Sequence, residues 1–157
     1  MRRGVRIGVD VGRARVGVAR CDRDGLLATP VETIQRASVD PVARLREIAV
    51  ELDAVEAVVG LPISLSGGDT ASTQDAREMA AQLAASMPVR LVDERLSTVS
   101  AAAGMRAAGR SAKQQRQSID QAAAVVILQH ALDSERASGR APGVLLDEGG
   151  SAAGEED

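Results

Sequence analysis

The N-terminal stretch of residues 5–19 constrains the fold most, because two apolar runs flank a short Gly-Arg-Ala-Arg turn. The runs cover residues 5–11 and 16–21, and this pattern predicts two antiparallel strands joined as a hairpin. Asp10 lies inside the first run, where a lone carboxylate is costly to bury without a partner. We therefore expect Asp10 to lie where the strand opens onto a polar site that contains a cation. The alternative is that Asp10 faces the turn at the end of the strand.

The chain has 157 residues and contains no Phe, Tyr or Trp. This length suits one domain with a real core, which must be built from aliphatic side chains and alanine. Proteins that bind single strands usually stack bases on aromatic rings. If this chain binds nucleic acid, we expect phosphate contacts and arginine planes instead.

Charge and composition divide the chain into a domain at 1–138 and a tail at 139–157. The tail holds five of the acids and one base, and its Gly, Ala, Ser and acidic composition predicts disorder. No apolar run approaches the ~20 residues that span a bilayer, and the start does not resemble a signal peptide. We expect no membrane association. Cys21 is the single cysteine, which favours a reducing cytoplasm and leaves open a disulfide between two chains.

Hydrophobic periodicity predicts the elements that follow the hairpin. They are, in order, a strand at 26–33, a helix from Asp40-Pro41 to about Leu52, a strand at 54–61, a helix at 72–86, a strand at 89–92, a helix at 97–108, a basic loop at 109–117 and a helix from a capping box at Ser118 to Ser138. This order predicts an α/β fold. Its mixed five-stranded sheet has three antiparallel and then two parallel strands, flanked by helices.

Three carboxylates are candidates for one site. Glu94 follows a strand end, where open sheets place ligands, and Asp120 lies in the expected first turn of the last helix, on its apolar side. Clustered with Asp10, these acids repel one another unless a cation joins them, and their oxygens suit Mg²⁺ or Mn²⁺. As alternatives, Glu94 pairs with Arg90 or Arg95, and Asp120 complements the helix dipole.

Basic residues gather around these acids in the sequence. Between Glu94 and Asp120 the sequence has five basic residues and no acidic residue. Two more basic residues lie in the Gly-Arg-Ala-Arg turn of the N-terminal hairpin. We expect phosphate contacts from these residues, although a solvated surface explains the same composition. The candidates for nucleic-acid binding are Arg13, Arg15, Arg95, Arg106, Arg110, Lys113 and Arg116.

Four segments in register, at 8–19, 59–68, 92–98 and 119–124, resemble the YqgF/RuvX family of bacterial pre-16S rRNA nucleases and Holliday junction resolvase-like proteins. The resemblance spans residues 4 to about 133. It implies an RNase H-like fold, a cytoplasmic location and a nuclease that uses two Mg²⁺ or Mn²⁺ ions. The catalytic and metal-binding acids of the family fall on Asp10, Glu94 and Asp120, with Asp10 bridging the metals.

The resemblance implies hydrolysis of phosphodiester bonds by metal-activated water, in processing the 5′ end of pre-16S rRNA during ribosome biogenesis. The alternative substrate is a Holliday junction, whose symmetric cleavage needs a two-fold dimer, so monomer and homodimer both stay open. A non-catalytic RNA-binding factor is a third hypothesis. The hairpin also resembles one lobe of the actin-like and sugar kinase ATPases, but a chain of 157 residues holds only one such lobe.

Overall fold

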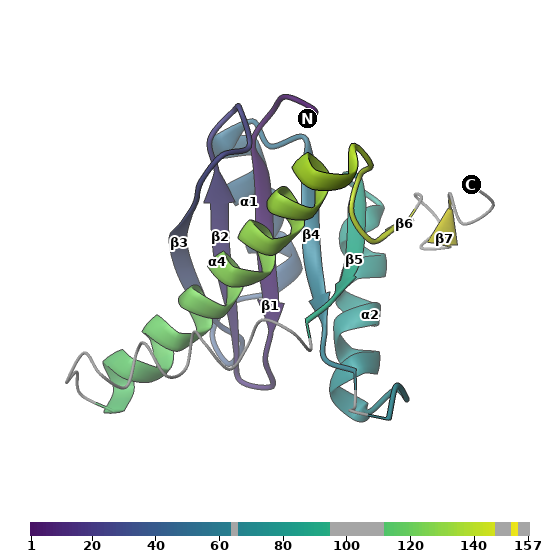
Figure 1. Cartoon of the computed structure of the whole chain (residues 1–157). Helices are drawn as coiled ribbons and strands as arrows, with labels where there is room; N and C mark the ends of the chain where they lie inside the picture. The colour runs from purple at the N-terminus through teal and green to yellow at the C-terminus, as the bar shows by residue number, and fades with distance from the viewer. Residues whose placement is uncertain (64–65, 95–111, 147–151, 154–157) are drawn as a thin grey trace.

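The computed structural model describes residues 1–63, 66–94, 112–146 and 152–153, and the side chains of 112–118 are not among the described parts. Figure 1 shows a single sheet with the helix at residues 112–138 across its front and the helices at 41–52 and 71–84 behind it. The elements are β1 (Arg6–Val11), β2 (Arg15–Cys21), β3 (Ala28–Gln35), α1 (Pro41–Leu52), β4 (Glu56–Leu61), α2 (Ala71–Ala84), β5 (Val89–Asp93), α4 (Ala112–Ser138), β6 (Val144–Leu146) and β7 (Ala152–Ala153).

The sheet has the strand order β3-β2-β1-β4-β5-β6-β7. β1, β2 and β3 pair antiparallel, and β4 and β5 continue the sheet parallel to β1. This confirms the expected α/β class, with three antiparallel strands followed by two parallel ones. β6 and β7 are two further strands, which pair antiparallel beyond β5.

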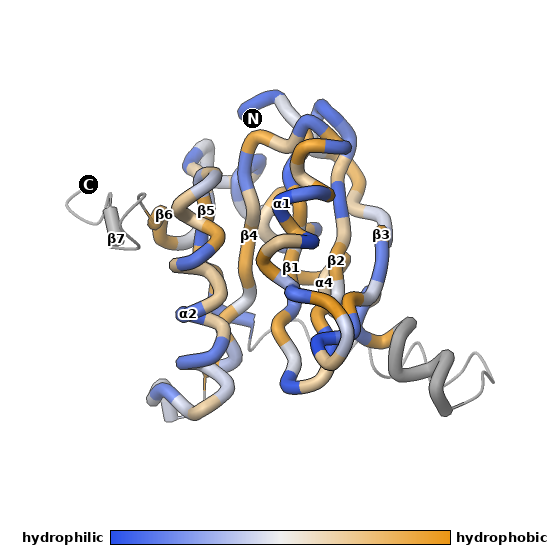
Figure 2. Tube along the Cα trace, turned by 180° about the vertical axis from the view of Figure 1, so that it is seen from behind, coloured by the Kyte–Doolittle hydropathy of each residue, from blue (hydrophilic) through white to orange (hydrophobic). Residues whose placement is uncertain are grey.

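The two faces of the sheet build two cores. Alternate residues of β1, such as Ile7 and Val9, pack with α1 and α2 in the larger core. The opposite face packs against α4 through residues such as Ala124 and Leu128. Figure 2, seen from behind, shows α1 and α2 over the apolar central strands. Of the helices in the described ranges, none is long and apolar enough to cross a membrane.

The helix starts test the expected capping signals. Asp40 caps α1 as expected, because its side chain accepts a hydrogen bond from the backbone N–H of Val42 at 3.1 Å. The expected start of the last helix at Ser118 is wrong, since α4 begins at Ala112. The residues before Ser118 are Lys, Gln and Arg, which favour helix, so the helix extends through the stretch expected as a basic loop. The expected helix at 97–108 lies outside the described residues.

The segment after α4 differs from the expected disorder. Val144–Leu146 form β6 beside β5, and the Leu146 side chain is buried in the larger core. Three consecutive apolar residues here cover the edge of β5, which would otherwise leave its backbone groups unpaired. Composition averaged over the whole tail conceals this short apolar run. Residues 147–151 and 154–157 lie outside the described part of the chain.

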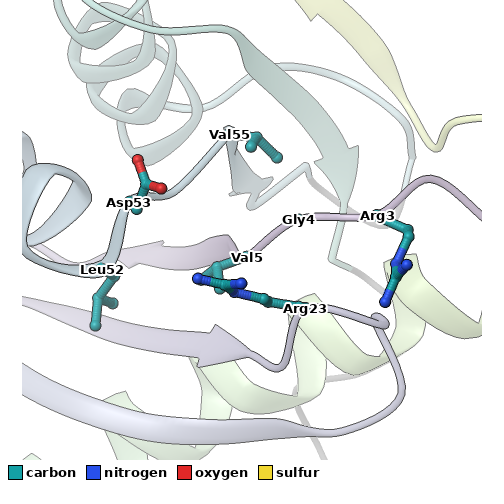
Figure 3. A pocket seen from close by; sticks show the side chains of 7 residues that line it. All are labelled: Arg3, Gly4, Val5, Arg23, Leu52, Asp53 and Val55. Carbon is teal, nitrogen blue, oxygen red and sulfur yellow. The ribbon is translucent and has the colours of Figure 1, made fainter.

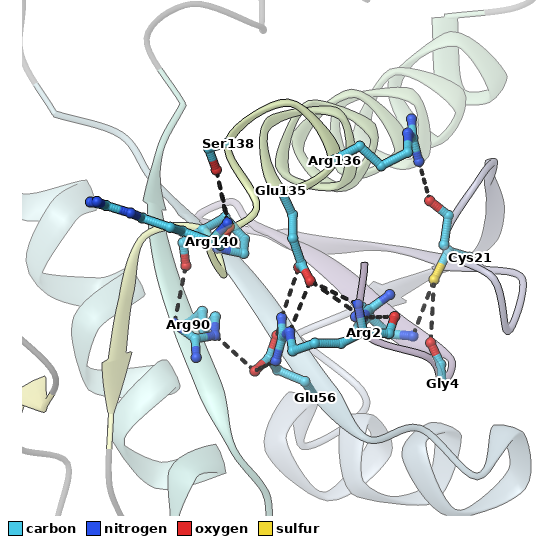
Figure 4. A network of polar contacts seen from close by, with 12 residues as sticks. Arg2, Gly4, Cys21, Glu56, Arg90, Glu135, Arg136, Ser138 and Arg140 are labelled. Carbon is cyan, nitrogen blue, oxygen red and sulfur yellow. Dashed lines mark hydrogen bonds and ion pairs between the residues drawn. The ribbon is translucent and has the colours of Figure 1, made fainter.

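A buried ion network holds the end of the sheet where β1 begins (Figure 4). The Arg2 guanidinium donates to Glu56 of β4 and to Glu135 of α4, each at 2.9 Å. Arg90 of β5 also donates to Glu56, at 2.8 Å. Both carboxylates have side chains only 4% exposed, so their charges depend on these arginines. The network ties the start of the chain to α4 and to two central strands.

Candidate active site

Asp10 lies near the carboxyl end of β1, on the face of the sheet that α4 covers. Its neighbours Val9 and Val11 point into the core on the opposite face, and Asp10 itself is half-buried. The strand continues through Val11, so Asp10 is a strand residue and not a turn residue. Asp10 is opposite Gly17 of β2 in the antiparallel register.

Gly17 brings Asp120 to this position. A Cβ atom at residue 17 would overlap the backbone oxygen of Asp120 and lie 3.1 Å from its Cβ atom. The backbone of α4 therefore rests directly on β2, next to the Asp10 position. Only a residue without a side chain permits this approach.

Glu94 follows β5 and lies over the neighbouring strand β4. Its backbone N–H donates to the carbonyl oxygen of Leu61 at 3.2 Å, which fixes it at the carboxyl end of β4. A Cβ atom at Gly60 would overlap Oε2 of Glu94, so the carboxyl group lies across the α4 face of β4. From there it forms a side-chain hydrogen bond with Asp10. Two of the three predicted acids are therefore in direct contact.

The electrostatics of this pair follow from burial and mutual repulsion. Burial, and to a smaller extent the negative charge of Asp120, raise the pKa of Asp10 to about 6, while the hydrogen bond with Glu94 opposes the shift. Burial and the neighbouring Asp10 charge raise the pKa of Glu94 to about 7. The two carboxyl groups can form this hydrogen bond only when the pair holds a proton between them. Raised carboxyl pKa values mark a buried site in which negative charge is unfavourable, and a bound cation would relieve that cost.

Among the described residues, Arg15 is a cation that pairs with one of these acids. Its Nε–H donates to Oδ2 of Asp120 at 2.7 Å. Burial raises the pKa of Asp120, and this ion pair opposes the shift. The sequence predicted Arg15 as a phosphate-binding residue but gave no sign of its contact with a candidate metal ligand.

The alternative for Asp120, and one of the two alternatives for Glu94, lose their support. Arg90 binds Glu56 instead of Glu94. Asp120 is the ninth residue of α4 as counted from Ala112, beyond the first turn where the helix dipole acts. Arg95, the other expected partner of Glu94, lies outside the described residues.

The remaining basic candidates are described only in part. Arg13 is exposed in the hairpin turn beside the acids. Lys113 and Arg116 lie on the first turns of α4, where the course of the backbone alone is described. Arg106 and Arg110, like Arg95, lie outside the described residues.

Other candidate sites are separate from the acids. Within the described residues, no three His, Cys, Asp or Glu side chains are already arranged as a metal site. A pocket of about 400 Å³ lies at the opposite end of β1 (Figure 3) and contains none of the three acids. Its lining residues are Arg3, Gly4, Val5, Arg23, Leu52, Asp53 and Val55. His130 is exposed and Cys21 is buried.

Sequence reasoning missed Gly17 and Gly60 as site residues. Each makes room for an acid by lacking a side chain, Gly17 for Asp120 and Gly60 for Glu94. The available signal was a glycine in the interior of an apolar strand, which often marks a close approach of other groups.

Comparison with known proteins identifies the family. The family model described as "RuvX: Holliday junction resolvase" matches residues 4–134. A protein of Clavibacter michiganensis subsp. michiganensis is 57% identical over 150 residues, which cover 93% of each chain. A Streptomyces coelicolor protein is 56% identical over 148 residues, which cover 91% of this chain and 88% of the relative. Both relatives bear the name "Putative pre-16S rRNA nuclease".

Solved structures support the fold. The structure "T. thermophilus RuvC in complex with Holliday junction substrate" has a TM-score of 0.50 and 17% sequence identity. The match covers 85% of this chain and 96% of that chain. The likeness extends the RNase H-like architecture to this sheet and its helices. Family model, close relatives and fold agree, and the chain belongs to the RuvX family of nucleases.

Proposed function

We propose that Asp10, Glu94 and Asp120 hold divalent cations, Mg²⁺ or Mn²⁺ and two in number, for hydrolysis of phosphodiester bonds. The observation that carries this proposal is the hydrogen-bonded Asp10–Glu94 pair beside the Asp120 charge. The donor set consists only of carboxylate oxygens, which hard cations prefer over the nitrogen and sulfur ligands of zinc. The three acids are therefore suitable ligands for Mg²⁺ or Mn²⁺.

Each residue then has a role in the chemistry. When bound, the cations lower the pKa of a water molecule and neutralise charge on the phosphate. Asp10 lies between the other two acids and would contact both ions, while Glu94 and Asp120 would each hold one side. The Asp10–Glu94 pair has to release its shared proton before both carboxylates serve as ligands. Arg13 is exposed in the hairpin turn, and its proposed role is to bind the substrate backbone.

The substrate that we propose is the 5′ end of pre-16S rRNA, cleaved in the cytoplasm during ribosome biogenesis. Support comes from the name that the relatives share and from the large part of their length that this chain covers. The absence of aromatic residues fits recognition through phosphates and arginines better than through stacked bases.

A four-way DNA junction is the second candidate substrate. The description of the family as a Holliday junction resolvase favours it, and so does the similar fold of a RuvC protein that was solved with a Holliday junction substrate. Symmetric cleavage of a junction requires two active sites, so this function requires a homodimer, whereas RNA trimming proceeds with a monomer.

Cleavage of the two substrates tests the proposal. The purified chain is incubated with a 16S rRNA precursor carrying its 5′ extension, and separately with a four-way DNA junction, with Mn²⁺ or with EDTA. We expect metal-dependent shortening of the RNA, absent in Asp10→Asn. Paired nicks in the junction with intact RNA would assign the resolvase function, and no cleavage of either would contradict the proposal.

A further inference from the structure

The ion pair between Arg15 and Asp120 occupies a carboxylate that the proposed function needs for a cation. Arg15 Nε and Asp120 Oδ2 are 2.7 Å apart, and the two side chains are 26% and 17% exposed. A guanidinium and a divalent cation cannot both bind Oδ2 of Asp120 closely, because both are positively charged and would repel each other there. The two cations therefore compete for Asp120.

The backbone geometry limits what has to move. Arg15 and Gly17 are two residues apart on β2, so both face α4. Because α4 rests on Gly17, the backbone of Asp120 is held in place by main-chain contact. The start of β2 is also fixed, since the Arg15 carbonyl accepts a hydrogen bond from Gly12 N at 2.9 Å. Exchange at Asp120 therefore requires movement of side chains and not of the backbone.

We infer that Arg15 is an exchangeable counter-charge that couples cation binding to nucleic-acid binding. This inference rests on the proposed function. Arg15 neutralises Asp120 while no divalent cation is present. When a cation takes Oδ2, the guanidinium turns to a phosphate of the nucleic acid, whose oxygens it binds in the same forked geometry as a carboxylate. Arg15 is thus a positioning residue for the proposed reaction.

A thermodynamic consequence follows from this exchange. A cation that binds without nucleic acid has to break the ion pair, so its affinity is reduced. A phosphate that attracts Arg15 removes that cost, and by linkage the cation raises the affinity for nucleic acid by the same factor. The two ligands therefore bind cooperatively through one side chain.

Mn²⁺ titration without nucleic acid, followed by electron paramagnetic resonance, tests the inference. Arg15→Gln should bind Mn²⁺ about tenfold more tightly than wild type, since it lacks a charge-assisted contact worth about 1.5 kcal/mol. Arg15→Lys keeps the charge and should bind Mn²⁺ less tightly than Arg15→Gln. Arg44→Gln is the matched control, because Arg44 is also 26% exposed and binds Glu32 at 2.7 Å, on β3. It should match wild type.

A second measurement tests the coupling. The affinity for a short oligonucleotide with non-hydrolysable linkages is measured with and without Mn²⁺. Mn²⁺ should increase the affinity of the wild type and of Arg44→Gln by more than it increases that of Arg15→Gln. Equal increases in all three would overturn the coupling.

The outcomes separate this inference from the proposed function. If Asp10→Asn abolishes Mn²⁺ binding but Arg15→Gln and wild type have equal Mn²⁺ affinity, the counter-charge inference is wrong and the metal site stands. If no Mn²⁺ binding depends on Asp10, the proposed function itself fails.

Discussion

Replacing Asp10 with asparagine should stabilise the metal-free protein. The pKa of Asp10 is raised from its ordinary 3.8 to about 6, because the folded state buries this carboxyl group beside other acids. The folded protein therefore binds more protons than the unfolded chain between these two values. Its stability falls as the pH rises through this window, and the loss is complete above it. At 1.36 kcal/mol per unit, the ionised Asp10 costs about 3 kcal/mol of folding free energy.

Asparagine has the same size and keeps a group that hydrogen-bonds Glu94, so the comparison isolates the charge. The assay is urea unfolding in EDTA at about pH 8 and about pH 4. Asp10→Asn should exceed the wild type in unfolding free energy by about 3 kcal/mol at the higher pH and by much less at the lower pH. Asp53→Asn is the control, since Asp53 is exposed and its left-handed backbone conformation also suits asparagine. A gain that is absent, or equal at both pH values, would refute electrostatic strain at Asp10.

Three further substitutions test the packing that positions the site. Glu135→Gln should destabilise the fold by about 2 kcal/mol in thermal or urea unfolding, because it removes a negative charge that compensates Arg2 in the buried network. The pKa of Glu135 is lowered from 4.5 to about 2, chiefly by hydrogen bonds from Arg2. The wild type should therefore lose the stability that the ionised Glu135 contributes as the pH falls from about 4.5 to 2, and the variant should show no such loss. Gly17→Ala should cost about 2 kcal/mol or more and abolish cleavage, because its methyl group displaces the Asp120 backbone; full activity would contradict the contact. Leu146→Ala should lower the free energy of unfolding by about 2–3 kcal/mol, because Leu146 is buried. Leu27→Ala is the control and should change stability little, because Leu27 is 63% exposed. Equal effects of the two substitutions would contradict β6 as part of the core.

The sequence contained enough information for the directions of the five central strands and for the position of Asp10 inside one of them. Alternating apolar residues and the cap at Asp40 specify local structure, because each depends on neighbours within one element. Asp10 was recognisable from the cost of a carboxylate in an apolar strand. These features are local, and the structure has them where the sequence indicated.

Features that depend on contacts between distant elements were not predictable in this way. The ion pair of Arg15 with Asp120 joins residues 105 positions apart, and nothing in either segment specifies the partner. The start of α4 at Ala112 depends on helix-favouring residues outweighing a capping signal at Ser118. β6 forms because β5 has an edge to cover, which is a property of the assembled sheet.

The most direct test of the metal-dependent nuclease is single-turnover cleavage of a 16S rRNA precursor or a four-way junction with excess enzyme. The wild type, Asp10→Asn and Arg44→Gln are compared in Mg²⁺, in Mn²⁺ and in EDTA. Wild type and Arg44→Gln should cleave one of these substrates with either ion and lose cleavage in EDTA, and Asp10→Asn should stay inactive in all three. Cleavage that persists in EDTA, or an Asp10→Asn variant as fast as the wild type, would contradict a metal site at Asp10, Glu94 and Asp120.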